Sequence, residues 1–96
     1  MKIPAKINIL GQEHSVEFDD TIVDLGRYVP DLNRILLKKT MDKIPIPDDK
    51  IYLSFWHEVL HGILINLEYR DLYADEEFIG RVSGAIYQII KQIKNI

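Results

Sequence analysis

The stretch KIYLSFWHEVLHGILINLEY, residues 50–69, decides the fold of this chain. Its apolar side chains recur at spacings of three and four residues, which predicts a helix with one apolar stripe. The stripe is centred near Trp56 and is formed by Tyr52, Trp56, Val59, Leu60, Ile63 and Leu67. Just before this helix, prolines disfavour helical geometry, and Asp48 or Asp49 is well placed to cap it.

A second helix is predicted from Asp75 to Lys94, after a break within EYRDLYADEE, residues 68–77. Asp75 is expected to be its N-cap, and the basic residues near its end suit the helix dipole. Gly80 and Gly84 disfavour a helix relative to alanine, so their presence indicates close contact between the two helices.

The segments before the first helix have the patterns of strands and turns. Residues 5–11 and 11–18 alternate apolar and polar side chains, which predicts a β-hairpin with its turn at Gly11-Gln12. Residues 19–31 are turn-like and irregular, and residues 34–38 form a third short strand. The predicted fold is therefore α+β, with a small three-stranded, antiparallel-type sheet followed by two helices in a single domain spanning residues 1–96.

The composition argues against several classes of function. The chain has no cysteine, which excludes disulfides, thiolate zinc ligands and thiol nucleophiles. Its net charge of -3 argues against nucleic-acid binding, and no segment has the length and apolar character of a membrane span. The first residues lack the features of a secretory signal, so a cytoplasmic location is expected.

Within the first predicted helix, His57, Glu58 and His61 form an H-E-x-x-H pattern. Side chains four residues apart lie on nearly the same face of a helix, so both imidazoles can bind one ion. Zinc suits this pair because neutral imidazole is a good ligand and because the ion acidifies a bound water. Glu58 would then be the general base. The alternative is a pair of half-buried histidines that bind no metal.

A catalytic zinc site of this kind needs a third protein ligand, which is best sought in ADEEF, residues 74–78. Glu76 lies on the flank of the second helix's apolar stripe, aligned with the small Gly80 and Ser83, and is the preferred candidate. Glu77 lies further round towards the exposed side and is the alternative. Either acid could instead serve only to complement the helix dipole.

Other polar residues carry weaker signals. His14 has no partner in the local sequence and is expected to be solvated on its strand. Tyr28, Tyr73 and Tyr87 could each donate a hydrogen bond to an oxyanion, but the sequence assigns none of them a role. The strand in NRILLKK, residues 33–39, could be an exposed edge that holds a peptide substrate.

The order of these segments resembles a known family. INILGQEHSVEF, DLGRYVPDLNRILLKK, FWHEVLHGIL and DEEFIGRVSGAIYQII are together similar to the small metallopeptidases encoded by phages and prophages. More distantly, they are similar to zincin-type peptidases of mobile elements that cleave repressors. The resemblance covers nearly the full chain, and its specific parts are HEVLHGIL and DEEFI…AIYQII. It implies a minimal zincin-like core with zinc on His57 and His61, Glu58 as base, and a third ligand that falls on Glu76 more comfortably than on Glu77.

The sequence therefore predicts a zinc-dependent metallopeptidase that hydrolyses a peptide or protein substrate, with Glu58 as general base. A phage origin would place it in the host-cell cytoplasm. The alternative is a non-catalytic zinc-binding or adaptor module that keeps an inert zincin-like core, which the small size of the domain favours. Either function leaves room for a protein partner, and neither involves nucleic acid or a membrane.

Overall fold

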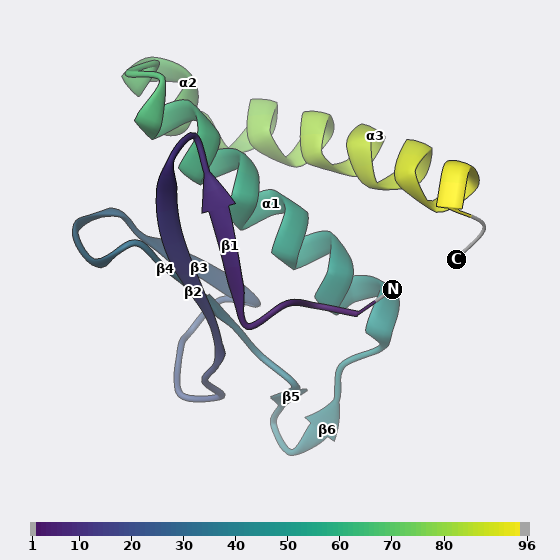
Figure 1. The fold of residues 1–96 in the computed structure, drawn as a ribbon. Helices are drawn as coiled ribbons and strands as arrows, with labels where there is room; N and C mark the ends of the chain where they lie inside the picture. The colour runs from purple at the N-terminus through teal and green to yellow at the C-terminus, as the bar shows by residue number, and fades with distance from the viewer. Residues whose placement is uncertain (1, 95–96) are drawn as a thin grey trace.

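A computed structural model describes residues 2–94 of the chain. The fold is α+β, as predicted, with a four-stranded mixed sheet and a small hairpin followed by two main helices that pack together (Figure 1). The strands are β1 (Lys6–Ile9), β2 (Gln12–Phe18), β3 (Gly26–Val29), β4 (Arg34–Leu37), β5 (Thr40–Met41) and β6 (Ile44–Pro45). The helices are α1 (Asp48–Asn66), the short α2 (Arg70–Tyr73) and α3 (Glu76–Lys94), with a 3-10 turn at Pro30–Leu32. None of the helices within residues 2–94 has the length and apolar character needed to span a bilayer.

The main sheet has the strand order β1-β2-β4-β3. β1 and β2 form the predicted antiparallel hairpin, β2 and β4 are parallel, and β3 pairs antiparallel with β4. The prediction of three strands in an antiparallel-type sheet is therefore wrong, because residues 26–29 add a fourth strand and β4 runs parallel to β2. The four-residue β3 shows no clear alternation, so its pairing with β4 is not visible locally. β4 is paired on both sides, so the prediction of an exposed edge at residues 33–39 is also wrong; the edge strands of this sheet are β1 and β3.

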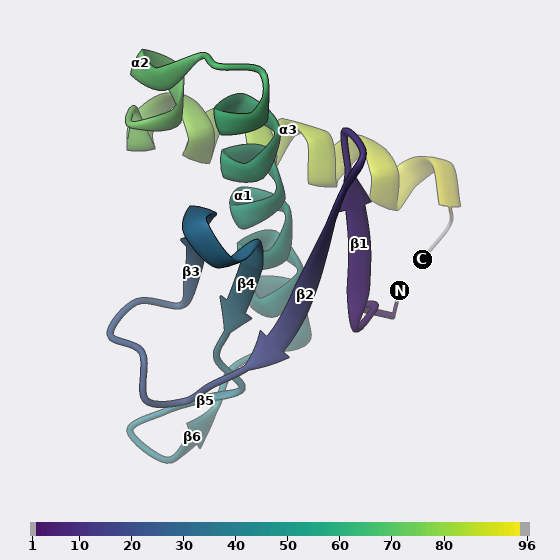
Figure 2. The same cartoon turned by 60° about the vertical axis from the view of Figure 1, so that its left-hand side comes forward.

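α1 lies between the sheet and α3 (Figure 1, Figure 2). Towards the sheet, Phe55 and Val59 belong to the main core cluster, which includes residues of β4. Towards α3, Leu60 packs in a second cluster with Ile79. The expectation of a single stripe centred near Trp56 is therefore wrong, and Trp56 is only half-buried. A helix with apolar side chains on more than one side is typical of a position between two layers.

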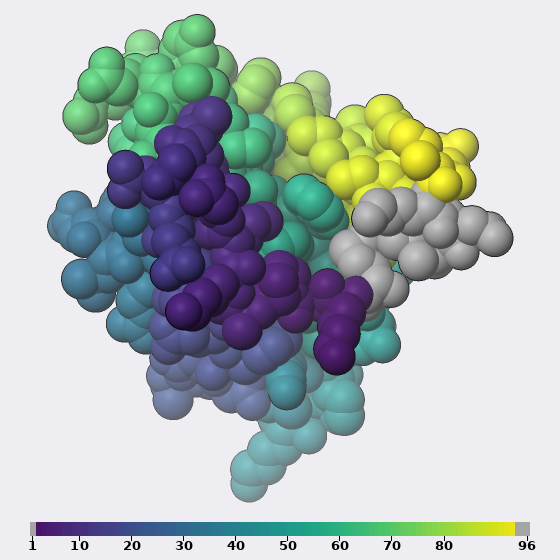
Figure 3. Space-filling model, viewed as in Figure 1, coloured from purple at the N-terminus to yellow at the C-terminus, as the bar shows by residue number. Residues whose placement is uncertain are grey.

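Gly62 allows α1 to approach the sheet closely. A Cβ atom at Gly62 would lie 2.9 Å from Ile9 Cδ1 and 3.0 Å from Tyr28 Cε1, shorter than the usual carbon–carbon contact of about 3.5–4.0 Å. Seen from the side of the β1–β2 hairpin, the hairpin covers part of α1 (Figure 3).

Gly80 and Gly84 of α3 have no other atom within 4 Å of such a Cβ. The prediction that these two glycines mark close helix–helix contact is therefore wrong.

The start of α1 is held to the C-terminal half of α3. Asp48 and Asp49 lie within the first turn of α1 and make no capping hydrogen bond, so the prediction that one of them caps the helix is wrong. The Asp49 carboxylate instead accepts a hydrogen bond from the Tyr87 hydroxyl at 2.6 Å and two from the Lys91 ammonium at 3.1 Å. These contacts lower the pKa of Asp49, the Tyr87 bond most. The Asp49 carboxylate therefore links α1 to α3 and does not cap the N-terminus of α1.

His14 is fully buried in β2, whereas the sequence predicted a solvated side chain. Its Nδ1 lies 2.9 Å from the Gln12 carbonyl oxygen, and its Nε2 lies 2.7 Å from the Tyr28 hydroxyl. Because a carbonyl can only accept, Nδ1 carries the proton and the Tyr28 hydroxyl donates to Nε2. The buried imidazole thus has two partners, and one of them comes from β3. Tyr28 consequently uses its hydroxyl proton within the core.

Candidate metal centre

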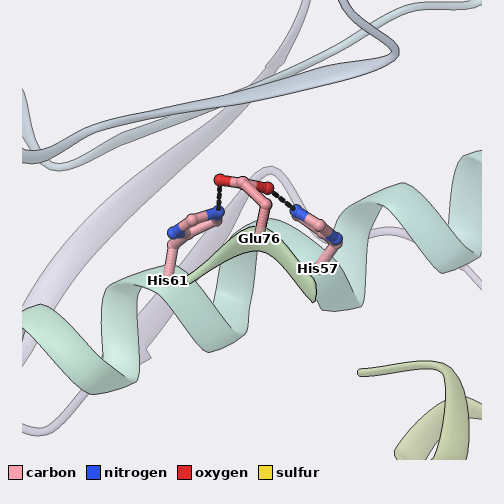
Figure 4. Close-up of side chains that lie close together, drawn as sticks. All are labelled: His57, His61 and Glu76. Carbon is pink, nitrogen blue, oxygen red and sulfur yellow. Dashed lines mark hydrogen bonds and ion pairs between the residues drawn. The ribbon is translucent and has the colours of Figure 1, made fainter. Parts of the chain in front are cut away.

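His57 and His61 project from the same side of α1, and the carboxylate of Glu76 reaches between them (Figure 4). One carboxylate oxygen of Glu76 lies 3.0 Å from Nε2 of His57, and the other lies 3.0 Å from Nε2 of His61. The centroids of the two imidazole rings are 5.1 Å apart. The three side chains therefore converge where α1 meets the start of α3.

Helix geometry and the turn before α3 produce this convergence. His57 and His61 are four residues apart, so they lie one above the other on α1. After α1 the chain reverses through α2, and the Asp75 carboxylate accepts a hydrogen bond from the Phe78 N–H at 3.0 Å. This bond agrees with the predicted N-cap and fixes where α3 begins. Glu76, the next residue, is thereby placed opposite the histidines.

The donor set fits a metal ion. The ligand atoms of His57, His61 and Glu76 all lie within 4.8 Å of one another. In a tetrahedral zinc site, ligand atoms about 2.0–2.1 Å from the ion are separated from one another by about 3.3 Å. Each histidine Nε2 lies 3.0 Å from a different oxygen of the Glu76 carboxylate, which is close to that separation. These three residues therefore form a possible metal-binding group.

Glu77 lies outside this group. Its carboxylate pairs with the guanidinium of Arg81 at 2.8 Å, and both side chains are largely exposed. Consecutive residues of a helix differ in direction by about 100°, which separates Glu77 from its neighbour Glu76. The structure therefore brings Glu76 to the two histidines and leaves the alternative acid on the surface.

His61 is the more buried of the two histidines, with 9% of its side chain exposed against 25% for His57. Burial lowers the pKa of His61, although the nearby Glu76 carboxylate acts in the opposite direction. The neutral imidazole that burial favours is the form that binds a metal. The Nδ1 atom of His61 is buried and has no hydrogen bond of normal geometry within residues 2–94. The backbone of Tyr73 is nevertheless near this ring and acts to raise the pKa of His61.

A cleft of about 800 Å³ opens beside the metal-binding group. One wall is formed by β3 and the residues just before it, and the opposite wall is the side of α1 that carries the histidines. The cleft is lined by residues 24–28, Leu53, Ser54, His57, Glu58, His61, Tyr73, Ala74 and Glu76. Ligand sites commonly have volumes of about 300–1,000 Å³, so the cleft is large enough to bring part of a substrate to the metal-binding group.

Glu58 lines this cleft, although only 6% of the residue is exposed. Burial raises the pKa of Glu58 to about 8, and the carboxylates of Glu76 and Asp24 add to the shift. A carboxyl group with a raised pKa in a cleft is a candidate general acid or base. The sequence predicted the position of Glu58 beside the histidines but gave no sign of its burial.

In the presence of a chelator, Glu58 is expected to destabilise the protein as the pH rises from 4.5 to about 8, whereas the lowered pKa of His61 acts in the opposite direction. The pKa of Glu58 rises from 4.5 to about 8 on folding, so the unfolded chain loses this proton first and ionisation favours unfolding across that window. The full shift corresponds to at most about 5 kcal/mol. Glu58→Gln should remove this component of the pH dependence and exceed the wild type in stability at pH 8, as measured by urea unfolding at several pH values.

Glu13→Gln is the control for this measurement, because it makes the same chemical change on an exposed side chain. A Glu58→Gln protein whose stability falls with pH as steeply as that of the wild type would contradict the assignment.

Two further residues of the cleft carried no clear signal in the sequence. The Tyr73 ring meets His61 edge-on, with centroids 5.1 Å apart, and burial raises its pKa, so its hydroxyl stays protonated near neutral pH. Tyrosine is common in small cores, so the sequence alone did not separate Tyr73 from Tyr28. Gly26 lies against Glu58, and this contact was hidden because β3 itself was not recognised.

No protein-family model matches the chain, and no curated protein or solved structure matches it either. The resemblance to phage-encoded metallopeptidases therefore stays a prediction from the sequence.

Proposed function

We propose that this chain is a zinc-dependent metallopeptidase. The observation that carries the proposal is the convergence of two imidazoles and one carboxylate in a cleft that also contains the buried carboxyl group of Glu58. His57, His61 and Glu76 would hold the zinc, and three protein ligands leave a position for water or substrate, as catalytic zinc sites require. The resemblance of HEVLHGIL to the peptidase motif supports the same assignment.

The residues of the cleft can carry out peptide hydrolysis together. Zinc held by the three ligands would supply Lewis acidity and would lower the pKa of a coordinated water. In its ionised form, which the positive charge of a zinc ion nearby would favour, Glu58 accepts a proton from the attacking water as the water oxygen bonds to the peptide carbonyl carbon. When the carbon–nitrogen bond breaks, Glu58 passes that proton to the leaving amine. Glu58 follows His57 directly on α1, so the base and the two histidine ligands share one wall of the cleft.

The edge strand β3 supports a peptide as substrate. β3 lies at the end of the strand order, and residues 24–28 line the cleft. An extended peptide can bind an edge strand through backbone hydrogen bonds. The sequence predicted that residues 33–39 bind a peptide substrate. We assign this role to β3 instead, because β4 is paired on both sides.

Two measurements on the wild-type protein test the proposal. Titration of the metal-free protein with zinc, followed by calorimetry, is expected to show one zinc ion bound per chain. The zinc-loaded protein is expected to cleave casein, to stop when a chelator is added, and to resume when zinc is restored. Zinc uptake without any zinc-dependent cleavage would favour the non-catalytic zinc-binding or adaptor module. Failure to take up zinc would contradict both functions.

A further inference from the structure

Gly26, the first residue of β3, leaves a space that the Glu58 side chain fills. A Cβ atom at Gly26 would lie 3.0 Å from Glu58 Oε2, 3.2 Å from Cγ and 3.4 Å from Cδ. The distances to Oε2 and Cγ are tighter than most contacts that a real Cβ makes, whereas the distance to Cδ is an ordinary contact. Any side chain at Gly26 would therefore compete with the carboxyl group of Glu58 for the same volume.

The backbone at Gly26 does not itself require glycine. Gly11, in the β1–β2 turn, has a φ of 86°, which disfavours other residues, whereas Gly26 lies outside the positive-φ region. The two glycines inside α3, Gly80 and Gly84, have open space where a Cβ would stand. Gly26 differs from all three because alanine would fit its backbone but would press against an ionisable side chain of the cleft, which would have to shift.

Neither side of this contact can move away easily. Gly26 is paired with Leu37 of β4, which is fully buried, and the carbonyl of Leu25 accepts a hydrogen bond from the N–H of Lys38 at 3.0 Å. Glu58 is 6% exposed and lies in the middle of α1, the helix packed between two layers. The backbone of β3 at Gly26 therefore limits where the carboxyl group of Glu58 can lie.

We propose that Gly26 is a positioning residue that sets where the carboxyl group of Glu58 stands relative to His57, His61 and Glu76. Because Gly26 has no side chain, the Glu58 side chain can extend against β3 while α1 stays close to the sheet. The consequence for catalysis rests on the proposed peptidase function, whereas the placement of Glu58 does not.

The test is a double-mutant cycle between Gly26→Ala and Glu58→Asp, since aspartate is shorter by one methylene group and withdraws from the contact. In the metal-free protein, Gly26→Ala is expected to lower the melting temperature by about 5 °C or more, and by much less in the Glu58→Asp background. Glu58→Gln, which keeps the length of glutamate, should give no such relief. Gly84→Ala is the matched control and should not lower the melting temperature.

In the zinc-loaded protein, Gly26→Ala is expected to lower kcat for casein cleavage about tenfold or more, with KM and zinc affinity nearly unchanged. Equal losses of melting temperature from Gly26→Ala in the wild-type and Glu58→Asp backgrounds would overturn the proposal. If wild-type protein binds zinc but cleaves nothing, the peptidase function fails, and the melting-temperature cycle still decides whether Gly26 positions Glu58.

Discussion

Glu58→Gln is expected to lower the rate of casein cleavage by the zinc-loaded protein about 10²–10⁴-fold and to leave zinc binding nearly intact. Glutamine has almost the same shape as glutamate, so the packing against β3 is kept. Its amide cannot accept the proton of the attacking water. The Glu58 side chain does not belong to the group of three ligand atoms, so its replacement should not release the metal.

Initial rates and zinc content should be measured on the same preparations of wild type and Glu58→Gln. Glu77→Gln is the matched control, because Glu77 is exposed and pairs only with Arg81 among the ion pairs of residues 2–94. Its cleavage rate should match the wild type. A Glu58→Gln protein that cleaves casein at the wild-type rate would show that Glu58 is not the base, and loss of its zinc would place Glu58 among the ligands.

Zinc affinity is expected to fall by more than about 100-fold in His61→Ala and in Glu76→Ala. Residues that only support a metal ligand contribute about 10–100-fold to affinity, so direct ligands should contribute more. His61 is largely buried and Glu76 is the only contact of the group from α3, so neither has an evident substitute nearby among the described residues. Competition with a chromophoric chelator measures both affinities.

Glu77→Ala is the matched control for the third ligand. Glu76 and Glu77 both lie in the first turn of α3, so each substitution removes the same favourable interaction with the helix dipole. Only Glu76→Ala should weaken zinc binding. The reverse result, with zinc lost in Glu77→Ala and kept in Glu76→Ala, would move the third ligand to Glu77.

Local patterns in the sequence were enough to predict the α+β class, the β1–β2 hairpin and the two long helices. These elements depend on spacings within a few turns or a few strand residues, which the sequence shows directly. The same reasoning placed His57 and His61 on one helix face and preferred Glu76 to Glu77 from its direction on the second helix. The structure brings these three residues together.

Long-range pairing explains what the sequence could not predict. β3 is a four-residue strand that forms only through β4, and the parallel pairing of β2 with β4 depends on a connection that leaves no local pattern. The sequence could not predict that His14 and Glu58 are buried, because polar side chains are usually exposed. His14 is buried because Tyr28 from β3 supplies a partner, and Glu58 is buried because Gly26 from the same strand leaves it space.

The position of α3 has a consequence for how the site would respond to metal supply. α3 packs on α1 rather than joining the sheet, so the site is complete only while the first turn of α3 is docked. An ion that binds only the docked helix stabilises it by about 2.7 kcal/mol when its free concentration is 100-fold above its dissociation constant. Far from this end, Tyr87 and Lys91 bind Asp49 through contacts that involve none of the three residues of the metal-binding group. Scarcity of zinc would therefore loosen α3 from the Glu76 end, and zinc availability would set the fraction of molecules with an assembled cleft.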